Sequence, residues 1–351
     1  MYSMPILLTQ QFRYCGNAFR ADMYRGCNFG CSYCYVSNRK GAYKNIFDIA
    51  DISRVERMFE RAFESDCVGS VNIEMLRHKV PLHVGGMSDP FQEREFELGL
   101  SYRLIELSNK YSYPMMFCTK QANFPDEYWQ ALSPELHAFQ VSLIGADEDY
   151  IRLYEHNTPS PLDRIDFVHK LKAKGFWVSI RLQPLISITR ALDLLHLIGK
   201  RIDYCTVEHL KIGADDRVMQ ERVFSQFGKG LFYKPRLGRS FEMLTEIKEG
   251  NIDRIKKQFP KLLVGVGDND LHHMTDSRCC CGIDTVNSNF NNWMKYNETY
   301  FVTGTYDKRR IWYPKKPFAN QVLNSSQKRK GFETVKDYVD DFMGWKEVVG
   351  N

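Results

Sequence analysis

The sequence predicts an α/β protein built around a parallel β-sheet. Short apolar segments typical of buried strands alternate with longer segments whose apolar residues recur every three or four positions, as on one face of a helix. Six such strand–helix units follow one another between residues 21 and 210. Because parallel strands are joined by long crossovers, these units imply a parallel sheet with right-handed connections. The periodicity does not indicate whether the sheet closes.

The expected elements follow from local patterns along the chain. The segment 52–65 places Val55, Phe59 and Phe63 at helical spacing, and the segment 95–111 has a similar apolar face. Gly175 stands where a helix ending at residue 174 would be capped. The expected strands span residues 21–25, 80–90 with a terminal turn, 114–120, 138–143, 176–182 and 203–210, and the other expected helices span 126–132, 161–174 and 191–199.

Composition restricts the class of protein. Apolar residues make up 43% of the chain and charged residues 26%, as in globular proteins with a sizeable core. No apolar run reaches the about 18 residues of a membrane helix, and the N-terminal residues lack the basic region of a secretory signal. Ten cysteines in such a chain favour reduced thiols or metal ligands over disulfides. We therefore expect a cytoplasmic protein without a membrane partner.

Three cysteines organise the expected chemistry. Cys27, Cys31 and Cys34 follow a CxxxCxxC spacing, with Tyr33 inside the last pair. Thiolates this close in sequence can converge on one metal centre, and sulfur ligands favour iron–sulfur clusters, zinc or copper(I). A cubane cluster normally has four cysteine ligands, so three without a nearby fourth indicate an iron atom open to another ligand. The alternatives are a zinc site with a more distant fourth ligand, or three unrelated buried thiols.

This spacing, with an aromatic residue before the third cysteine, resembles the signature of the radical S-adenosylmethionine (SAM) enzymes. The resemblance implies a [4Fe-4S] cluster, SAM bound at the open iron, and reductive cleavage of SAM to a 5′-deoxyadenosyl radical. It also implies a partial (β/α)6 barrel of the TIM type, with the cluster loop after the first strand. We accordingly expect an N-terminal arm at 1–20, the barrel at 21–215, and an α-rich C-terminal extension at 216–351 that covers the substrate site.

Further motifs resemble the spore photoproduct lyase branch of these enzymes. They are the Ser-Asp-Pro turn at 88–90, the Thr-Lys strand end at 119–120 and the Pro-Ser-Pro helix start at 159–161. The resemblance implies SAM contacts from Lys120 and Ser142, and places Arg181 and Gln183 near the SAM carboxylate or ribose. An ordinary ion pair is the alternative for Arg181. The other implied cofactor contacts are Tyr33, Gly85, Gly86, Met87, Ser88 and Asp89.

The chain departs from the lyase at one position. Where the resemblance implies a hydrogen-donating cysteine, this chain has Met87. A thioether cannot serve as that donor, so we do not expect thymine-dimer repair by the same route. The consecutive residues Cys279, Cys280 and Cys281 offer a donor or an auxiliary metal centre, because neighbouring side chains diverge and at least one should face a site. Cys118 is a competing donor, and small buried apolar residues are the alternative for the run.

A basic and aromatic segment points to a nucleic-acid partner. Residues 308–330 contain eight Lys or Arg and no Asp or Glu, and residues 229–239 have a similar character, although the net charge of the chain is only +5. Cations can pair with phosphates and exposed aromatic rings can stack on bases. A solvated basic face is the alternative. The expected contact residues are Lys308, Arg309, Arg310, Trp312, Tyr313, Lys315 and Lys316.

These patterns together predict a radical SAM enzyme that abstracts hydrogen from a nucleic-acid base or a modified nucleotide. The sequence leaves open whether the reaction is that of a lyase, an isomerase or a transferase. A peptide or small metabolite is the alternative substrate, and a non-catalytic metal-binding nucleic-acid module is the alternative class of protein. The enzyme would also need an electron donor such as flavodoxin or ferredoxin.

Overall fold

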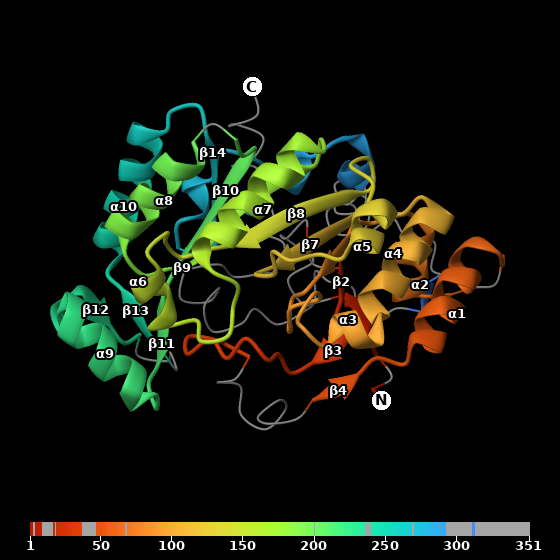
Figure 1. Ribbon diagram of the computed structural model, residues 1–351, viewed down its shortest axis with the longest axis horizontal. Coiled ribbons are helices and arrows are strands. Elements are labelled where there is room, and N and C mark those ends of the chain that lie inside the picture. Colours follow the sequence, from red (N-terminus) through yellow and green to blue (C-terminus); the bar gives the residue numbers. More distant parts are fainter. Residues whose placement is uncertain are drawn as a thin grey trace.

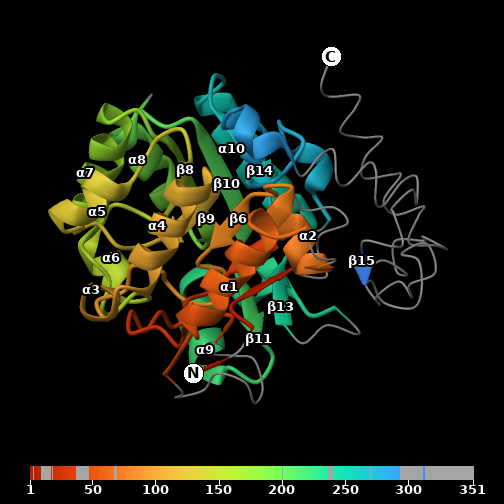
Figure 2. The ribbon, with the colours of Figure 1, turned by 90° about the vertical axis from the view of Figure 1, so that its right-hand side faces the viewer.

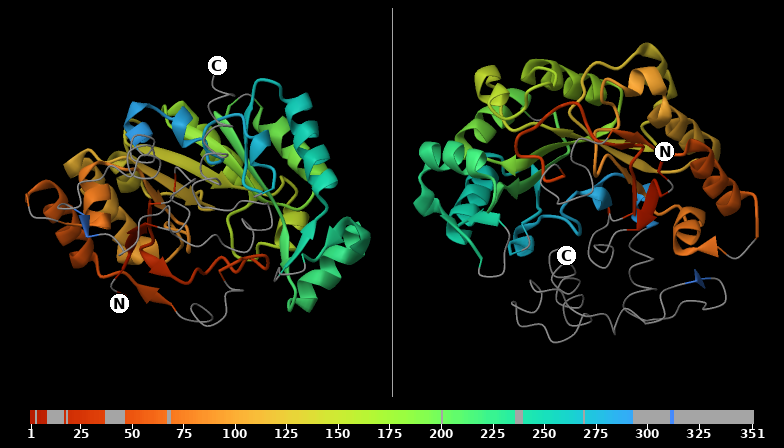
Figure 3. Two further views of the ribbon diagram at one scale, coloured as in Figure 1. Left: turned by 180° about the vertical axis from the view of Figure 1, so that it is seen from behind. Right: turned by 90° about the horizontal axis from the view of Figure 1, so that it is seen from below.

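The centre of the molecule is an eight-stranded sheet with the order β1-β2-β6-β7-β8-β9-β10-β14. The computed structural model describes residues 1–2, 4–8, 17, 19–36, 47–66, 69–199, 201–235, 240–268, 270–292 and 311–312. Neighbouring strands are parallel from β2 to β14, and β1 pairs antiparallel with β2. The sheet curves with helices on its outer face, and its two edge strands, β1 and β14, do not pair with each other in the described residues (Figures 1 and 3). The expected partial barrel is confirmed.

The strands of this sheet from β2 to β14 end at a common edge, because parallel strands share one direction, whereas the antiparallel β1 ends at the opposite edge. The strands of the sheet are β1 (Ile6–Leu8), β2 (Phe19–Ala21), β6 (Leu82–Val84), β7 (Met115–Thr119), β8 (His137–Ser142), β9 (Trp177–Leu185), β10 (Tyr204–His209) and β14 (Leu263–Val266). Every residue of β7 and β8 is buried, as expected for parallel strands that are covered on both faces.

Helices connect the strands and cover the outer face of the sheet (Figure 1). They are α1 (Ile52–Phe63), α2 (Val71–Arg77), α3 (Glu95–Leu98), α4 (Leu100–Tyr111), α5 (Asp126–Ala131), α6 (Glu148–Arg152), α7 (Pro161–Ala173), α8 (Ile188–Ile198) and α10 (Thr245–Gln258). The Pro-Ser-Pro helix start is a capping box, in which Ser160 Oγ accepts from the N–H of Asp163 and the Asp163 carboxylate accepts from the Ser160 backbone.

The single helix expected at 95–111 is two helices. Gly99 has a φ of 66°, a left-handed conformation that ends α3. The carboxylate of Glu95 then accepts hydrogen bonds from the N–H groups of Ser101 (2.9 Å) and Tyr102 (2.7 Å), the free donors of the first turn of α4. The break therefore has a local cause that helical periodicity does not reveal.

A smaller unit, which we call the accessory unit, follows β10. It consists of β11 (Lys211–Gly213), α9 (Arg217–Phe227), the 3-10 helix η2 (Lys229–Leu231), β12 (Phe232–Tyr233) and β13 (Ser240–Met243). Its strands form a separate antiparallel sheet in the order β11-β13-β12 (Figures 1 and 2). A second hydrophobic core lies here, formed with Tyr150 and Ile151 of α6 and with Tyr154 just after it.

Two short strand pairs complete the described structure. β3 (Tyr24–Arg25) pairs antiparallel with β4 (Asp48–Ile49), next to the cysteine motif. β5 (Gly69–Ser70) pairs parallel with β15 (Ile311–Trp312), which is the described part of the basic segment at 308–330. The other expected nucleic-acid contacts lie outside the described residues. Among the described helices, none is both long enough and apolar enough to span a membrane.

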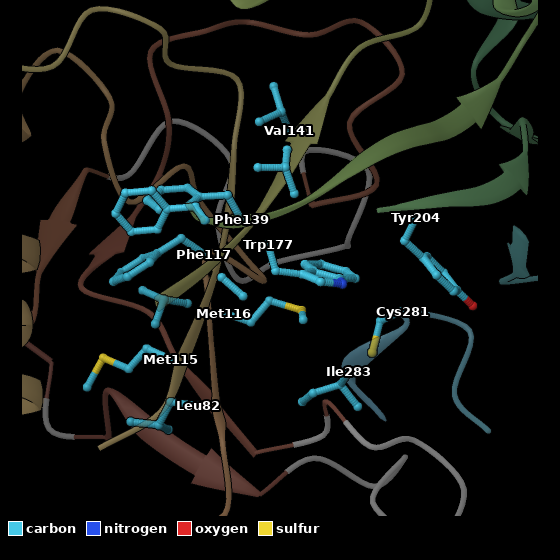
Figure 4. Packing of buried hydrophobic residues seen from close by; sticks show 14 of the residues in the cluster. Leu82, Met115, Met116, Phe117, Phe139, Val141, Trp177, Tyr204, Cys281 and Ile283 are labelled. Carbon is cyan, nitrogen blue, oxygen red and sulfur yellow. The ribbon is translucent and has the colours of Figure 1, made fainter. Parts of the chain in front are cut away.

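The segment that follows β14 packs on the inner face of the sheet. It contains the 3-10 helices η3 (His272–Met274), η4 (Ile283–Thr285) and η5 (Ser288–Asn291). Figure 4 shows Cys281 and Ile283 beside Met116, Trp177 and Tyr204, residues of three different strands. Residues assigned to the expected extension therefore complete the barrel core, and residues assigned to the expected arm supply β1 and most of β2.

Replacing Gly265 by alanine should destabilise the fold. A Cβ atom at this position would overlap the carbonyl of Cys280 and the hydroxyl of Tyr204, so backbone as well as side chain must move. Overpacking of this kind costs about 1–3 kcal/mol, a loss that urea denaturation would detect in the free energy of unfolding. In Gly250→Ala, the control in α10, no atom lies within 4 Å, and alanine should stabilise the helix by about 0.5–1 kcal/mol. Equal values for both variants would contradict the packing described.

Candidate active site

The cysteine motif lies on a loop that the protein holds at several points. Gln92 Nε2 donates a hydrogen bond to the carbonyl of Gly26 (3.1 Å). The N–H of Ser32 donates to the carbonyl of Tyr154 (2.8 Å), so the middle of the loop is tied to the end of α6. Gly26 and Gly30 have φ angles of 86° and 62°, which glycine adopts without strain. The turn at both glycines is therefore built into the sequence.

Cys27, Cys31 and Cys34 are neighbours on this loop. Cys27 is exposed and the other two are half-buried. Burial raises the pKa of the Cys27 thiol to about 12, with a further contribution from the nearby Asp89 carboxylate. Burial also raises the pKa of Cys31 to about 12, and both other thiols add to this effect. The three sulfur atoms are thus close enough to influence one another's charge.

This donor set fits an iron–sulfur cluster in its chemistry. Sulfur ligands suit iron–sulfur clusters, and a positive centre favours the thiolate forms that burial disfavours. Within the described ranges no three His, Cys, Asp or Glu side chains are gathered closely enough to hold a metal ion. The three thiols therefore have to converge when a cluster binds.

The glycine turn after β6 touches the cysteine loop, because the hydroxyl of Tyr35 donates to the carbonyl of Gly86. Gly85 has a φ of 102°, and a Cβ atom there would lie 2.5 Å from the carbonyl oxygen of Cys118. Only glycine fits this position without moving the backbone. Two residues further on, the backbone N–H of Met87 donates to Oδ1 of the buried Asp22 (2.7 Å). The turn thus brings bare backbone to the cysteine loop.

Ser88 and Asp89 use their side chains to support this turn. Ser88 Oγ donates to the carbonyl of Tyr24 (2.8 Å). The Asp89 carboxylate accepts from the hydroxyl of Thr119 (2.7 Å) and from the backbone N–H of Lys120 (2.6 Å). Burial raises the pKa of Asp89, although these hydrogen bonds act in the opposite direction. Asp89 therefore fastens the turn to the end of β7.

A fully buried ion pair connects the cysteine loop to the sheet. Glu155 Oε2 accepts from Arg164 Nη1 (2.6 Å), and neither side chain is exposed. Arg164 Nη1 also donates to the carbonyl of Ser142, at the end of β8 (3.1 Å). The hydroxyl of Tyr33 donates to the other carboxylate oxygen of Glu155. Lys120 Nζ lies 3.9 Å from that oxygen and 5.6 Å from the centre of the Tyr33 ring.

The charges of this network support one another. Burial alone would raise the pKa of Glu155, but Arg164, Lys120 and the Tyr33 hydroxyl lower it below its usual value, so Glu155 is a carboxylate at neutral pH. Burial would lower the pKa of Lys120, but the carboxylate of Glu155 raises it. Lys120 therefore remains a cation beside the cysteine loop. The expected SAM contacts Lys120 and Ser142 are thus joined to Tyr33 through one carboxylate.

Polar side chains of β9 and β10 form a second row at the same edge of the sheet. Arg181 Nη1 donates to Cys118 Sγ (2.8 Å), and its Nε donates to the amide oxygen of Gln183. Gln183 in turn donates to Glu208, whose other oxygen pairs with Lys211 Nζ at 2.6 Å. Arg181 is therefore bound to a thiol and an amide, and the ion pair considered as its alternative is not found in the described part of the chain.

The four cysteines considered as hydrogen donors lie in two places. Cys118 is at the end of β7, and its Sγ lies 3.7 Å from Ser142 Oγ. Cys279 and Cys281 belong to the main hydrophobic core, with their sulfur atoms 3.1 Å apart, and Cys280 is half-buried. Alternate members of the run thus face the core, as expected from the divergence of neighbouring side chains.

Several residues of this region were not identified from the sequence. Glu155 and Arg164 lie in an irregular segment and on a helix, and neither belongs to a recognisable motif. Asp22 is buried under the glycine turn, where burial raises its pKa to about 6 although Arg20 and three backbone hydrogen bonds lower it. The spacing of these residues in the sequence does not predict their roles, because each acts through a tertiary contact.

Comparison with known proteins identifies the fold. No protein-family model matches the chain, and no curated protein matches it. Among solved structures, a spore photoproduct lyase variant with bound AdoMet and dinucleoside spore photoproduct has a TM-score of 0.50 at 13% identity, covering 73% of this chain and 79% of that one. A second variant of the same enzyme gives the same values. SuiB from Streptococcus suis, bound to S-adenosylmethionine, has a TM-score of 0.46 at 12% identity and covers 72% of this chain and 50% of its own.

The fold is that of the radical SAM enzymes. Within that class, the similar structures with a TM-score of 0.50 are of spore photoproduct lyase, so the resemblance inferred from sequence motifs is confirmed for the fold. The three-cysteine loop and the glycine turn lie together at the edge where parallel α/β folds bind their ligands.

Replacing Glu155 by alanine should strongly destabilise the protein. The change leaves the buried guanidinium of Arg164 without its carboxylate, and breaking a buried pair on one side costs about 3–5 kcal/mol. Urea denaturation measures this loss. In the control Glu148→Ala, the lost partner is Arg152 on the exposed face of α6, and the expected cost is about 0.3–0.5 kcal/mol. Losses of similar size in the two variants would argue against Glu155 as the centre of the network.

Proposed function

We propose that this protein is a radical SAM enzyme. The observation that carries the proposal is the position of the three-cysteine loop beside the glycine turn, at the carboxyl-terminal edge of a radical SAM-type partial barrel. When bound, a [4Fe-4S] cluster would supply the electron that cleaves SAM to methionine and a 5′-deoxyadenosyl radical. Cys27, Cys31 and Cys34 would hold that cluster.

The residues of this chain would then bind and orient SAM. Gly85 and Gly86 offer backbone to the SAM amino group, because Gly85 permits a close approach. Lys120, kept cationic by Glu155, offers a charge to the SAM carboxylate. Ser142 and Gln183 lie at strand ends on the same edge, where they are proposed to complete the cofactor contacts with Tyr33.

The proposed substrate is a nucleic-acid base or a modified nucleotide. Two observations support this class: the basic and aromatic segment at 308–330, and the likeness in fold to a lyase whose solved structure holds a dinucleoside spore photoproduct. Met87 in place of the lyase's cysteine argues for a different reaction on such a substrate. A peptide or small metabolite is the alternative, and an electron donor such as flavodoxin or ferredoxin is the proposed redox partner. The proposed location is the cytoplasm.

Cys118 is the proposed hydrogen-atom donor to a substrate radical, which would leave its sulfur as a thiyl radical. Its thiol lies at the end of β7, in contact with Arg181 and Ser142, at the edge that carries the cysteine loop. Cys279 and Cys281 lie in the core, which favours a packing role for them. Residues 21–215 are proposed to carry the cofactor, and later residues are proposed to cover the substrate.

Removing the three cysteines tests the enzyme class. The variant with Cys27, Cys31 and Cys34 all replaced by alanine should lose bound iron and sulfide after anaerobic reconstitution. It should also lose reductive cleavage of SAM, measured as 5′-deoxyadenosine in the presence of a strong reductant. Cys205→Ala, which removes a buried thiol of β10, is the control and should keep both. Retention of iron by the triple variant, or an intact cluster without SAM cleavage in the unaltered protein, would refute the proposal.

Neutralising the basic segment tests the substrate class. Replacing Lys308, Arg309 and Arg310 by glutamine should weaken DNA or RNA binding and flatten its salt dependence by about 2–3 in slope, because each lost phosphate contact contributes about 0.7–0.9. Fluorescence anisotropy at several salt concentrations measures both. The control replaces Arg54, Arg57 and Arg61, three exposed cations of α1. Binding that is absent, or equally affected by both variants, would favour a peptide or small metabolite.

A further inference from the structure

Two guanidinium groups and an imidazole meet beside the glycine turn. Arg20 of β2 and His83 of β6 are direct partners in the parallel register of these strands. Burial, Arg181 of β9 and Arg20, in that order, lower the pKa of His83 to about 3. Arg181 therefore acts on the same imidazole as Arg20. His83 is therefore neutral at physiological pH. Three strands that are not adjacent to one another in sequence thus bring basic side chains to one place.

These groups have fewer protein partners than their burial requires. Arg20 Nε is buried without a hydrogen bond, and so is His83 Nε2. Arg20 Nε lies 3.4 Å from Oδ2 of the Asp22 carboxylate. Its other oxygen, Oδ1, already accepts from the N–H of Met87. Because a buried polar atom without a partner is costly, the arrangement indicates that a ligand supplies the missing acceptor.

The charges at this place do not balance. Asp22 can neutralise Arg20, but Arg181 is held by a thiol and an amide, those of Cys118 and Gln183. Glu208, another carboxylate that acts on Arg181, pairs directly with Lys211, so one positive charge is left without a counter-ion of its own in this group of side chains. A ligand atom carrying negative charge would compensate it, and guanidinium groups are the side chains best suited to bind carboxylate or phosphate.

Gly86 leaves space at this point. A Cβ atom on Gly86 would lie 3.4 Å from Cδ of Arg20 and 3.8 Å from Cε1 of His83, so a side chain there would fill the region between them. Arg181 Nε and Nη1 already donate hydrogen bonds to Gln183 and Cys118. The Arg181 side chain would therefore lose little conformational entropy when a ligand binds.

We propose that Arg20, His83 and Arg181 form a binding site for an anionic group of the substrate, a phosphate or a carboxylate. Arg20 and Arg181 supply the charge, and the neutral His83 can donate one hydrogen bond from Nε2. The site rests on the proposed function in that its ligand is the substrate of the same barrel. It narrows that substrate to a molecule with an anionic group, as in a nucleotide.

Inorganic phosphate is the probe for this site. Line broadening of its 31P NMR signal, recorded with the full-length protein at constant ionic strength, reports binding without any need for the cluster or for turnover. Arg20→Gln and Arg181→Gln should each weaken phosphate binding about ten-fold or more, the usual value of a hydrogen bond to a charged group. The control Arg103→Gln removes an exposed arginine of α4 that pairs with Glu56 and Glu106, and should bind phosphate normally.

The result expected with SAM separates the two sources of an anion. If the site belongs to the substrate, saturating SAM should leave phosphate binding in place. If SAM displaces phosphate, and both variants lose SAM affinity to the same extent, the site holds the SAM carboxylate and the proposal is overturned. Equal phosphate binding by all variants also overturns it. Arg20→Lys, which retains the charge, should bind with intermediate affinity and serves if Arg20→Gln does not fold.

The two proposals can fail separately. Phosphate binding that depends on Arg20, in a protein that does not cleave SAM, would support the anion site and reject the radical SAM activity. SAM cleavage in a protein whose phosphate binding does not depend on Arg20 would support the radical SAM activity and reject the anion site.

Discussion

The buried ion pair between Glu155 and Arg164 is the interaction on which the candidate site depends. Taking two charges out of water is expensive, and the cost is offset only when the remaining polar atoms find partners. Here the partners are the Tyr33 hydroxyl, the Lys120 ammonium and the carbonyl of Ser142, which belong to the cysteine loop and to the ends of two strands. The same contacts that satisfy the buried charge therefore position the side chains proposed to bind SAM.

The parallel sheet imposes a second constraint. Since all strands from β2 to β14 point the same way, their ends share one edge, and each strand can contribute only the few residues at its end. The chain uses these positions densely: Asp22, the glycine turn, Lys120, Ser142 and the row that begins at Arg181. Packing beneath them is supplied by the segment after β14, so the polar edge rests on a filled barrel core.

Sequence patterns were informative where the chemistry is local. The cysteine spacing, the glycine turn and the capping box at Ser160 are short motifs. The strand–helix alternation predicted the parallel sheet, and the resemblance to radical SAM enzymes implied its partial barrel form. The break at Gly99 was missed because it depends on the side chain of Glu95 capping the next helix. Glu155, Arg20 and His83 were missed because their roles arise from contacts between distant segments. The assignment of β14 to the barrel required the fold itself, since a strand of four residues carries little pattern.

The accessory unit would have a consequence for the retention of the proposed iron–sulfur cluster. Tyr154 packs in the second hydrophobic core, while its carbonyl accepts from Ser32 of the cysteine loop. Proteins open locally in cooperative parts, and small cores open at lower free energy than large ones. Opening of the accessory unit would release this anchor while the main barrel stays folded. The lifetime of a bound cluster would then measure the local stability of this small core, and not the global stability of the protein.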